Sequence, residues 1–294
     1  MDESIDITGK TAVITGATAG VGLATALALV AAGANIIAVG RNASRIKTAE
    51  ESIRSTYPDA RIKYLLTDLS LQSQVRQLAT EIREELASQG ITCLDILVNN
   101  AGLYSQKRVK TAEGIELTLA TNYLAPFLLT HELLPLLQVT PDGRIINISS
   151  ASHYGTRLNL KRLGSPLIYI GFWAYKVSKL AGVLFTLELN RRLIGTNVRA
   201  FAVDPGLVAT EIASKSPNNI SSMFWKRHSQ FGVQPEVPAR VVLFTANSAA
   251  PRNSPEIYWR DFHSKAPSRN AQDVEMAQAL WEKSMELCHI NSSH

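Results

Sequence analysis

The 294-residue sequence has few of the features that mark secreted, membrane-embedded or nucleic-acid-binding proteins. Only two cysteines are present, Cys93 and Cys288, which is too few for a disulfide framework and favours a reducing compartment. The first nine residues are polar and lack the basic and apolar regions of a signal peptide. We therefore expect a cytoplasmic protein.

Long hydrophobic runs and blocks of like charge are also missing. The longest apolar stretches, residues 21–34 and 124–139, are too short or too interrupted for a membrane span, which needs about 20 apolar residues. The net charge is +5, and the basic residues are spread along the chain. We expect no membrane span and no nucleic-acid partner, and a mild preference for anionic small molecules.

What the sequence has is apolar material, 46% of its residues, arranged as short Val/Ile-rich runs that alternate with longer helical patterns. This alternation is typical of a parallel sheet with crossover helices. Continuous apolar runs predict strands that are buried on both faces. Since no repeat or linker marks a second domain, residues 1–294 are predicted to form a single doubly wound, Rossmann-type α/β domain.

The expected elements follow in regular order. Strands are predicted at residues 11–15, 35–40, 61–66, 94–99, 143–149, 197–203 and 257–259. Helices are predicted at about residues 22–32, 43–57, 70–88, 114–138, 173–193, 238–246 and 273–287. Residues 210–234 mix Ser, Asn and Pro with a few large apolar residues, which indicates an irregular segment after the sixth strand.

A glycine-rich loop follows the first strand. Glycines permit a tight turn and close backbone approach, and the N-terminus of the following helix offers free N–H groups to a pyrophosphate. The spacing differs from G-x-G-x-x-G, and such a loop can simply close a strand–helix connection. Its position between strand and helix favours dinucleotide binding by Gly16, Thr18, Ala19, Gly20, Val21 and Gly22.

The second strand ends in Gly40-Arg41-Asn42, at the point where such folds contact the adenosine ribose. An acid there would favour NAD, whereas Arg41 can pair bidentately with a 2′-phosphate, which favours NADP. The alternative for Arg41 is a solvent-exposed residue at a helix start. Asp68, followed by Leu69 after the third strand, caps the next helix, holds the adenine edge, or does both.

Tyr175 and Lys179 occupy positions i and i+4 of a predicted helix and therefore share one face. A free tyrosine titrates near pH 10, and a nearby ammonium lowers the pKa of the phenol and makes it a better acid–base catalyst. Such a pair also occurs by chance on helix surfaces. Further candidate positions lie at the ends of other strands, where open α/β sheets bind ligands: Asn99, Asn100, Ala101, Gly102, Ser149, Ser150, Pro205, Gly206 and Thr210.

Taken together, these elements resemble the short-chain dehydrogenase/reductase family. The matches, in the family's order, are TGATAGVG, Asp68-Leu69, NNAG, Asn122, Ser150, YKVSK, and Pro205-Gly206 with Thr210. The serine pair followed by a histidine, the insertion before Tyr175 and the tail around Trp281 resemble the retinol-dehydrogenase-like branch. The N-terminus lacks the membrane anchor that some of those enzymes carry, and residues 212–234 match nothing in that branch.

The resemblance implies a role for each catalytic residue. Ser150 would bind the carbonyl oxygen, Tyr175 would donate the proton, Lys179 would lower the tyrosine pKa, and Asn122 would bind a water that relays protons to Lys179. Ser149 is the alternative catalytic serine. The cofactor, NADP, would contact the glycine loop and Arg41, Asn42, Asp68, Leu69, Asn99, Ala101, Gly102, Tyr175, Lys179, Pro205, Gly206, Val208 and Thr210.

The resemblance also implies a substrate lid at residues 210–234. Met223, Phe224 and Trp225 in this segment favour a lipophilic or aromatic substrate, although ordinary burial of a loop explains them equally well. His153 and Tyr154 could touch substrate or serve packing. The apolar helices 114–138 and 173–193 correspond to a common dimer interface in the family, which is compatible with a homodimer or homotetramer. No metal-ligand spacing is present.

The leading hypothesis is therefore an NADP(H)-dependent oxidoreductase that interconverts a ketone or aldehyde and an alcohol. A dehydratase or epimerase on the same fold would keep the same serine, tyrosine and lysine. A cofactor-sensing regulator without turnover is a third hypothesis, which is disfavoured because such proteins commonly lose the tyrosine or the lysine.

Overall fold

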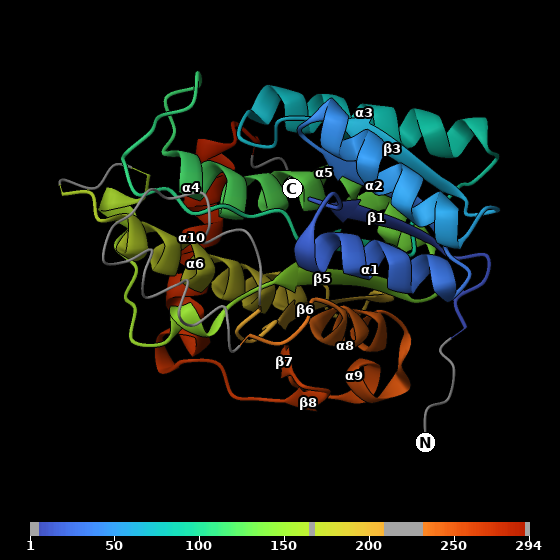
Figure 1. Ribbon diagram of the computed structural model, residues 1–294. Coiled ribbons are helices and arrows are strands. Elements are labelled where there is room, and N and C mark those ends of the chain that lie inside the picture. The colour runs from blue at the N-terminus through green and yellow to red at the C-terminus, as the bar shows by residue number, and fades with distance from the viewer. Residues whose placement is uncertain (1–5, 165–167, 209–231, 292–294) are drawn as a thin grey trace.

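A computed structural model of the protein describes residues 6–164, 168–208 and 232–291 as one sheet with helices on both faces (Figure 1). The strand order is β3-β2-β1-β4-β5-β6-β7-β8, and all pairs are parallel except the β7–β8 hairpin. The predicted doubly wound α/β fold is confirmed. The strands are β1 (Thr11–Thr15), β2 (Asn35–Gly40), β3 (Ile62–Leu66), β4 (Ile96–Asn99), β5 (Gly143–Ile148), β6 (Val198–Val203), β7 (Tyr258–Arg260) and β8 (His263–Ser264).

The helices follow the predicted order, with boundaries that shift by a few residues. The α-helices are α1 (Gly20–Ala31), α2 (Ala43–Thr56), α3 (Gln72–Ser88), α4 (Leu117–Leu119), α5 (Ala125–Val139), α6 (Gly171–Arg192), α8 (Glu236–Asn247), α9 (Ala249–Asn253) and α10 (Val274–Leu287). Shorter turns are the π-helix η1 (Ala120–Leu124) and the 3₁₀ helices η2 (Ala151–His153), η3 (Leu160–Arg162) and η4 (Arg269–Gln272). Sequence patterns did not predict α9, β8 or these short turns.

The predicted helix 114–138 starts later and is interrupted. Gly114 has a φ of +81°, outside helical geometry, and the Glu116 carboxylate accepts hydrogen bonds from the amides of Thr118 and Leu119, both at 2.9 Å. The helix therefore begins at Leu117, and a π-helical turn then separates α4 from α5. A π-helical turn inside an α-helix often marks a functional position, because it displaces one residue from the regular ladder.

The start of α3 also differs from the prediction. Asp68 Oδ1 accepts a hydrogen bond from the Ser70 amide at 2.9 Å and forms a turn, so the helix begins at Gln72 instead of Ser70. The first amides of α3 are bound by Glu113, 2.6 Å from Gln72 N and 3.0 Å from Ser73 N. The helix cap is thus supplied by Glu113, from a distant loop, and not by Asp68.

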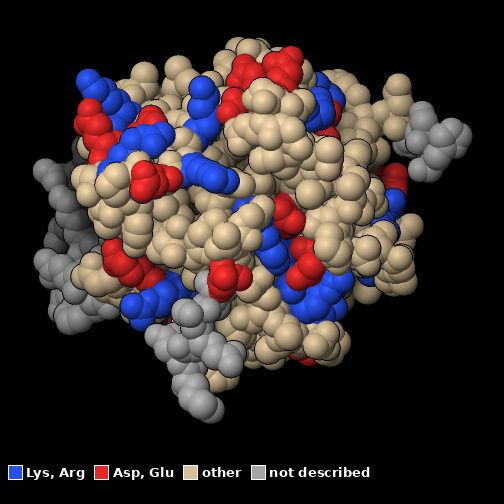
Figure 2. All heavy atoms as spheres, turned by 90° about the vertical axis from the view of Figure 1, so that its right-hand side faces the viewer, with Lys and Arg blue, Asp and Glu red and all other residues tan. Residues whose placement is uncertain are grey.

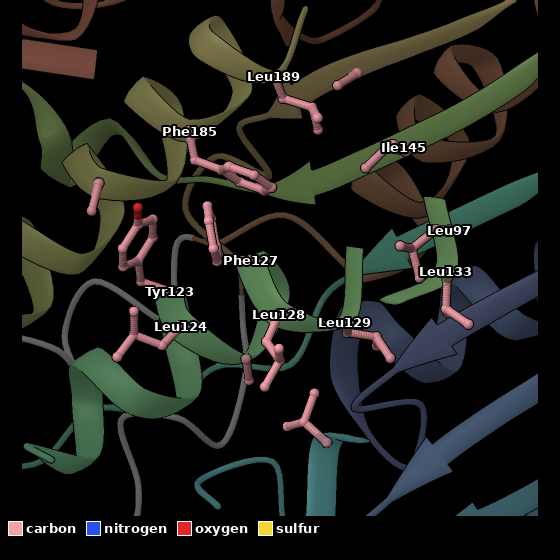
Figure 3. Close-up of a cluster of buried hydrophobic side chains, with 14 of the residues drawn as sticks. Leu97, Tyr123, Leu124, Phe127, Leu128, Leu129, Leu133, Ile145, Phe185 and Leu189 are labelled. Carbon is pink, nitrogen blue, oxygen red and sulfur yellow. The ribbon is translucent and has the colours of Figure 1, made fainter. Parts of the chain in front are cut away.

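Side chains of the central strands alternate between two hydrophobic cores, one on each face of the sheet. Val13 and Leu97 contribute to the core covered by α3, α5, α6 and α10, while Ile14 and Val98 contribute to the core covered by α1, α2 and α8. In the first core, Phe127 and Phe185 face each other at a ring-centroid distance of 5.4 Å (Figure 3). Burial on both faces explains why the strands are continuous apolar runs.

Helix α10 covers the apolar faces of α5 and α6. The Trp281 ring lies 5.0 Å from the Phe127 ring and 6.0 Å from the Phe185 ring, and Tyr123 Oη is 2.6 Å from Ser284 Oγ. The sequence analysis associated these two helices with an oligomer; α10 covers part of their apolar surface.

Charges of both signs are interspersed on the end of the molecule seen at the right in Figure 1, where neither sign forms a continuous patch (Figure 2).

Among the described helices, none has the length and hydrophobicity needed to cross a membrane. Within the same residues, no three His, Cys, Asp or Glu side chains come together as metal ligands. Cys93 and Cys288 are free thiols. Thr210, Met223, Phe224 and Trp225 lie outside the described residues.

Candidate active site

The carboxyl ends of the parallel strands meet at one edge of the sheet and bring most of the predicted site residues together. The glycine loop follows β1, residues 100–102 follow β4, the serine pair follows β5, and residues 204–208 follow β6. Val208 pairs with Val233, so the two ends of the segment between them lie side by side. The candidate site is therefore built from four neighbouring strands.

The glycine loop has the geometry of an anion cradle. Gly16 and Gly20 have φ values of +67° and +54°, and a Cβ on Gly22 would lie 2.2 Å from the Gly16 carbonyl oxygen. Ala19, the N-cap residue of α1, makes no side-chain hydrogen bond to the helix, and the first turn carries no acid. The amides of α1 are thus left to an external anion, which fits the pyrophosphate of a dinucleotide.

Asn100 locks this loop to the end of β4. Its Nδ2 donates to the carbonyl oxygens of Thr15 at 2.9 Å and Gly16 at 3.2 Å. Asn99, the predicted cofactor residue, is only 4% exposed and directs its amide into the sheet, toward Thr130 Oγ1 at 3.0 Å and Asn147 Oδ1 at 2.9 Å. The sequence analysis gave Asn100, the second asparagine of NNAG, no role of its own. In the structure it holds the glycine loop against the end of β4.

The end of β2 presents Arg41 to solvent. A Cβ on Gly40 would lie 2.6 Å from Thr18 Cγ2, so glycine is required for Thr18 to pack there. Asn42 Oδ1 accepts from the Arg45 amide at 3.0 Å and caps α2, which commits this oxygen to the helix. Arg41 is exposed beside the glycine loop, in the position expected for contact with the adenosine end of a dinucleotide.

A further residue that sequence patterns did not single out supports the same loop. Tyr64, on β3, donates its hydroxyl to the carbonyl oxygen of Ala17 at 2.9 Å. Asp68 is exposed and Leu69 is buried just beyond the same strand. Tyr64 thus supports the glycine loop, whereas the helix cap predicted for Asp68 is supplied by Glu113.

Ser150, Tyr175 and Lys179 converge at the centre of this edge. The Ser150 side chain is near enough to the Tyr175 phenol to favour its ionised form, and Lys179 Nζ lies 5.7 Å from the centroid of the Tyr175 ring. Lys179 is 7% exposed and donates a hydrogen bond to the Ile148 carbonyl oxygen at 2.9 Å. The Tyr104 ring packs edge-on against Tyr175 at 6.3 Å. The predicted Tyr–Lys pair therefore lies near Ser150, with Lys179 buried and Tyr175 partly exposed.

Burial governs the protonation of this pair. Burial lowers the pKa of Lys179 to about 8, against an opposing effect of the Asp204 carboxylate. Burial raises the pKa of Tyr175 to about 12; the nearby Ser150 hydroxyl opposes this rise, and Asp204 adds to it. The sequence analysis expected Lys179 to lower the pKa of Tyr175, whereas in this structure burial raises it overall.

Asn122 lies in the π-helical turn and joins two parts of the site. Its Oδ1 accepts from the Leu103 amide at 2.8 Å, while its Nδ2 donates to the Leu103 carbonyl oxygen at 2.9 Å and to Ser178 Oγ at 3.1 Å. Asn122 therefore fixes the loop after β4 against α6, one helix position from Lys179. Without the displaced π-helical geometry, the side chain would not lie in this register.

A small cavity lies behind Lys179. Among the described residues, two buried oxygens that face this region, Ser149 Oγ and Asn99 Oδ1, have no hydrogen-bond partner. Buried polar groups of this kind usually bind water. The cavity is lined by Asn99, Ala101, Asn122, Tyr123, Pro126, Asn147, Ile148, Ser149, Ser178, Lys179, Gly182 and Phe185.

The two serines after β5 point to different places. Ser149 is 6% exposed and lines the cavity, whereas Ser150 lies near the Tyr175 phenol and hydrogen bonds with the amide and the hydroxyl of Ser152, both at 3.1 Å. This geometry supports the choice of Ser150 as the serine that meets a substrate.

Asp204 is a site residue that the sequence analysis missed. It is 2% exposed, and its carboxylate accepts hydrogen bonds from Gly206 N at 3.0 Å and from the Tyr258 hydroxyl at 2.9 Å. Its charge acts on both Lys179 and Tyr175. The sequence signal that could have identified Asp204 is an acidic residue at the end of a buried strand, directly before Pro205-Gly206.

A doubly wound sheet with a glycine loop and polar side chains at its carboxyl edge is typical of dinucleotide-binding enzymes. Residues 10–221 match the family model described as short chain dehydrogenase. Human retinol dehydrogenase 12 is 33% identical over 244 residues, covering 83% of this chain and 75% of that protein. Mouse retinol dehydrogenase 13 is 33% identical over 259 residues, covering 85% and 75%.

A solved structure agrees with this match. The structure of an uncharacterized protein from Mycobacterium paratuberculosis has a TM-score of 0.74 at 31% identity and covers 97% of this chain and 95% of that chain. The chain belongs to the short-chain dehydrogenase family, as an oxidoreductase of its retinol-dehydrogenase-like branch.

Proposed function

We propose that the protein is an NADP(H)-dependent oxidoreductase that interconverts a ketone or aldehyde and an alcohol. The observation that carries the proposal is the convergence of Ser150, Tyr175 and Lys179 beside the glycine loop. The two free cysteines favour a reducing compartment, so we place the activity in the cytoplasm.

The chemistry of the site follows from these side chains. NADPH held by the glycine loop and Arg41 would supply the hydride that the carbonyl carbon accepts. The Ser150 hydroxyl binds the carbonyl oxygen as negative charge develops on it, and Tyr175 donates its phenolic proton to that oxygen. Lys179 stabilises the phenolate that remains, and Asn122 holds the loop and the polar cavity from which the proton is replaced. In the oxidative direction Tyr175 accepts the proton.

Two features support the finer parts of the proposal. Arg41 is exposed at the end of β2, and no acid occupies the ribose position, which favours NADP. Phe172 and Trp173, in the first turn of α6 before Tyr175, are 46% and 47% exposed, and Leu207 in the loop after β6 is 37% exposed. Exposed apolar side chains around a catalytic edge favour a lipophilic or aromatic substrate.

The test is a change in NADPH absorbance with a panel of carbonyl compounds: all-trans-retinal, aromatic aldehydes, aliphatic ketones and small polar ketones. We expect turnover of apolar carbonyls, and a preference for NADPH over NADH. Absence of turnover across the panel with both cofactors would contradict the proposal. Conversion of a hydroxy compound without net change in NADPH would instead indicate a dehydratase or epimerase.

A further inference from the structure

A buried histidine next to Ser150 has both of its ring nitrogens hydrogen bonded. His153 is 0% exposed, its Nδ1 lies 2.7 Å from the Ser150 carbonyl oxygen, and its Nε2 lies 3.0 Å from the Ser268 amide nitrogen. The rings of Tyr154 and Tyr258 enclose it, at centroid distances of 4.2 Å and 5.0 Å. The imidazole therefore joins the serine segment to the chain that follows β8.

These two contacts define the protonation state of His153. The Ser268 amide can only donate, so Nε2 carries no proton, and the Ser150 carbonyl can only accept, so Nδ1 carries the proton. An imidazolium would direct an N–H group at the Ser268 N–H. The nearby charges are Asp204 and Lys265, which act in opposite directions, and burial lowers the pKa of His153. The neutral Nδ1–H tautomer is the one that fits.

Ser150 needs such support because it lies beyond the sheet. Strand β5 ends at Ile148, and the carbonyl oxygen of Ser150 is held by His153, through Nδ1 and through the backbone amide at 3.2 Å. At the other end of the residue, Ser150 Oγ accepts a hydrogen bond from the Ser152 amide and donates one to the Ser152 hydroxyl. The direction of the catalytic hydroxyl is thus fixed by contacts within residues 150–153.

The chain after β8 is the partner of this segment. Besides the His153 contact, the Tyr154 hydroxyl donates to the Ala266 carbonyl oxygen at 2.5 Å, and Asn270 Nδ2 donates to the Thr156 carbonyl oxygen at 2.6 Å. Three successive hydrogen bonds therefore fasten residues 153–156 to residues 266–270. Of these three links, only the one through His153 reaches Ser150.

We propose that His153 is a positioning residue for Ser150, and that residues 266–270 are the fixed support through which it acts. The inference rests on the proposed function, because it concerns the placement of the hydroxyl that binds the carbonyl oxygen. A displacement of about 1 Å in a catalytic group can cost about 100-fold in rate. Loss of the Nδ1 contact should therefore reduce kcat and leave cofactor binding unchanged.

Three substitutions separate the two contacts. His153→Asn keeps an N–H donor near the position of Nδ1, His153→Gln keeps an acceptor near the position of Nε2, and His153→Phe removes both. We expect kcat to fall about 10- to 100-fold in His153→Phe and His153→Gln, with His153→Asn restoring most of it. The KM for NADPH should stay within about twofold. His263→Phe, at an exposed histidine of β8, is the matched control.

A merely structural role predicts a different result. In that case the variants would have lower unfolding temperatures, but kcat per bound cofactor would equal that of the native enzyme, and this outcome would overturn the proposal. Nitrogen-15 NMR of labelled histidine gives a measurement that needs no turnover: Nδ1 should be protonated and Nε2 unprotonated at pH 7. The opposite tautomer would overturn the proposal, whereas a chain with this tautomer that reduces no carbonyl would contradict only the proposed function.

Discussion

Lys179 Nζ donates a 2.9 Å hydrogen bond to the carbonyl oxygen of Ile148, the last residue of β5. The buried ammonium is thus held by a neutral carbonyl, and among the described residues Asp204 is the carboxylate whose charge acts on it. A carbonyl satisfies one N–H donor without neutralising the charge. Placing the Lys179 ammonium beside the Tyr175 phenol therefore costs the folded protein the free energy of removing that charge from water.

Replacement of this lysine should stabilise the protein. Because the pKa of Lys179 is lowered to about 8 from 10.5, the unfolded chain binds more protons between these two values, and native stability rises with pH across that window. Below pH 8 the buried lysine stays protonated, and this costs the folded protein about 3 kcal/mol according to the shift in its pKa. The hydrogen bond to Ile148 offsets about 1 kcal/mol of that cost. The free energy of unfolding of Lys179→Met at pH 7 should therefore exceed that of the native protein by about 2 kcal/mol, as measured by urea unfolding.

The pH dependence provides the control for this effect. The advantage of Lys179→Met should be smaller at pH 9.5 than at pH 7, because the native lysine has by then lost its proton. The exposed Lys161→Met should show neither the gain nor its dependence on pH. A destabilised Lys179→Met at pH 7 would show that the ammonium is favourably solvated in the fold.

Removal of the phenol should abolish turnover. Tyr175→Phe loses the proton donor and retains the ring that packs against Tyr104, so we expect kcat to fall by at least about 1,000-fold. Cofactor affinity, measured by quenching of protein fluorescence, should change little. Tyr57→Phe, at the end of α2, removes the same atom outside the site. Appreciable residual activity in Tyr175→Phe would rule out Tyr175 as the proton donor.

Arg41 should determine the choice between the two nicotinamide cofactors. Arg41→Asp replaces the guanidinium with a charge that repels a 2′-phosphate and can bind a free ribose hydroxyl. We expect the KM for NADPH to rise at least about tenfold while the KM for NADH changes much less. Lys47→Asp makes the same change of charge on an exposed part of α2. An equal rise for both cofactors would contradict the assignment of NADP.

The cap of α3 gives a prediction about stability. Burial raises the pKa of Glu113, but hydrogen bonds from the Ser73 and Gln72 amides and the Ser73 hydroxyl, with the charge of His289, lower it overall. A lowered carboxyl pKa contributes stability above its ordinary value of 4.5 and loses it as the pH falls below that value. Glu113→Ala should cost about 1 kcal/mol at pH 7 and less near pH 3.

Asp68→Asn is the comparison for this variant, because the amide oxygen still accepts from Ser70 and α3 keeps its cap. We expect a change below about 0.5 kcal/mol in urea unfolding. A larger effect of Asp68→Asn than of Glu113→Ala would show that the local turn, and not the distant carboxylate, limits the stability of α3.

Local patterns in the sequence predicted strands β1 to β7 and most of the helices. Residues such as Val13 and Ile14 alternate between two apolar cores, and this double burial produces the continuous apolar runs that identify the strands. The helix at residues 114–138 was predicted less well, because its break depends on Glu116 and on the register that places Asn122 beside Leu103. Periodicity carries no information about such contacts.

The sequence by itself determined the fold class, the glycine loop and the Tyr175–Lys179 pair, because each depends on residues close together in the chain. Only the tertiary structure decided how burial sets their protonation, and which residues support them from elsewhere. Asp204, Asn100 and the link from His153 to Ser268 belong to that second group. Their roles depend on contacts between segments far apart in the sequence, which no local pattern records.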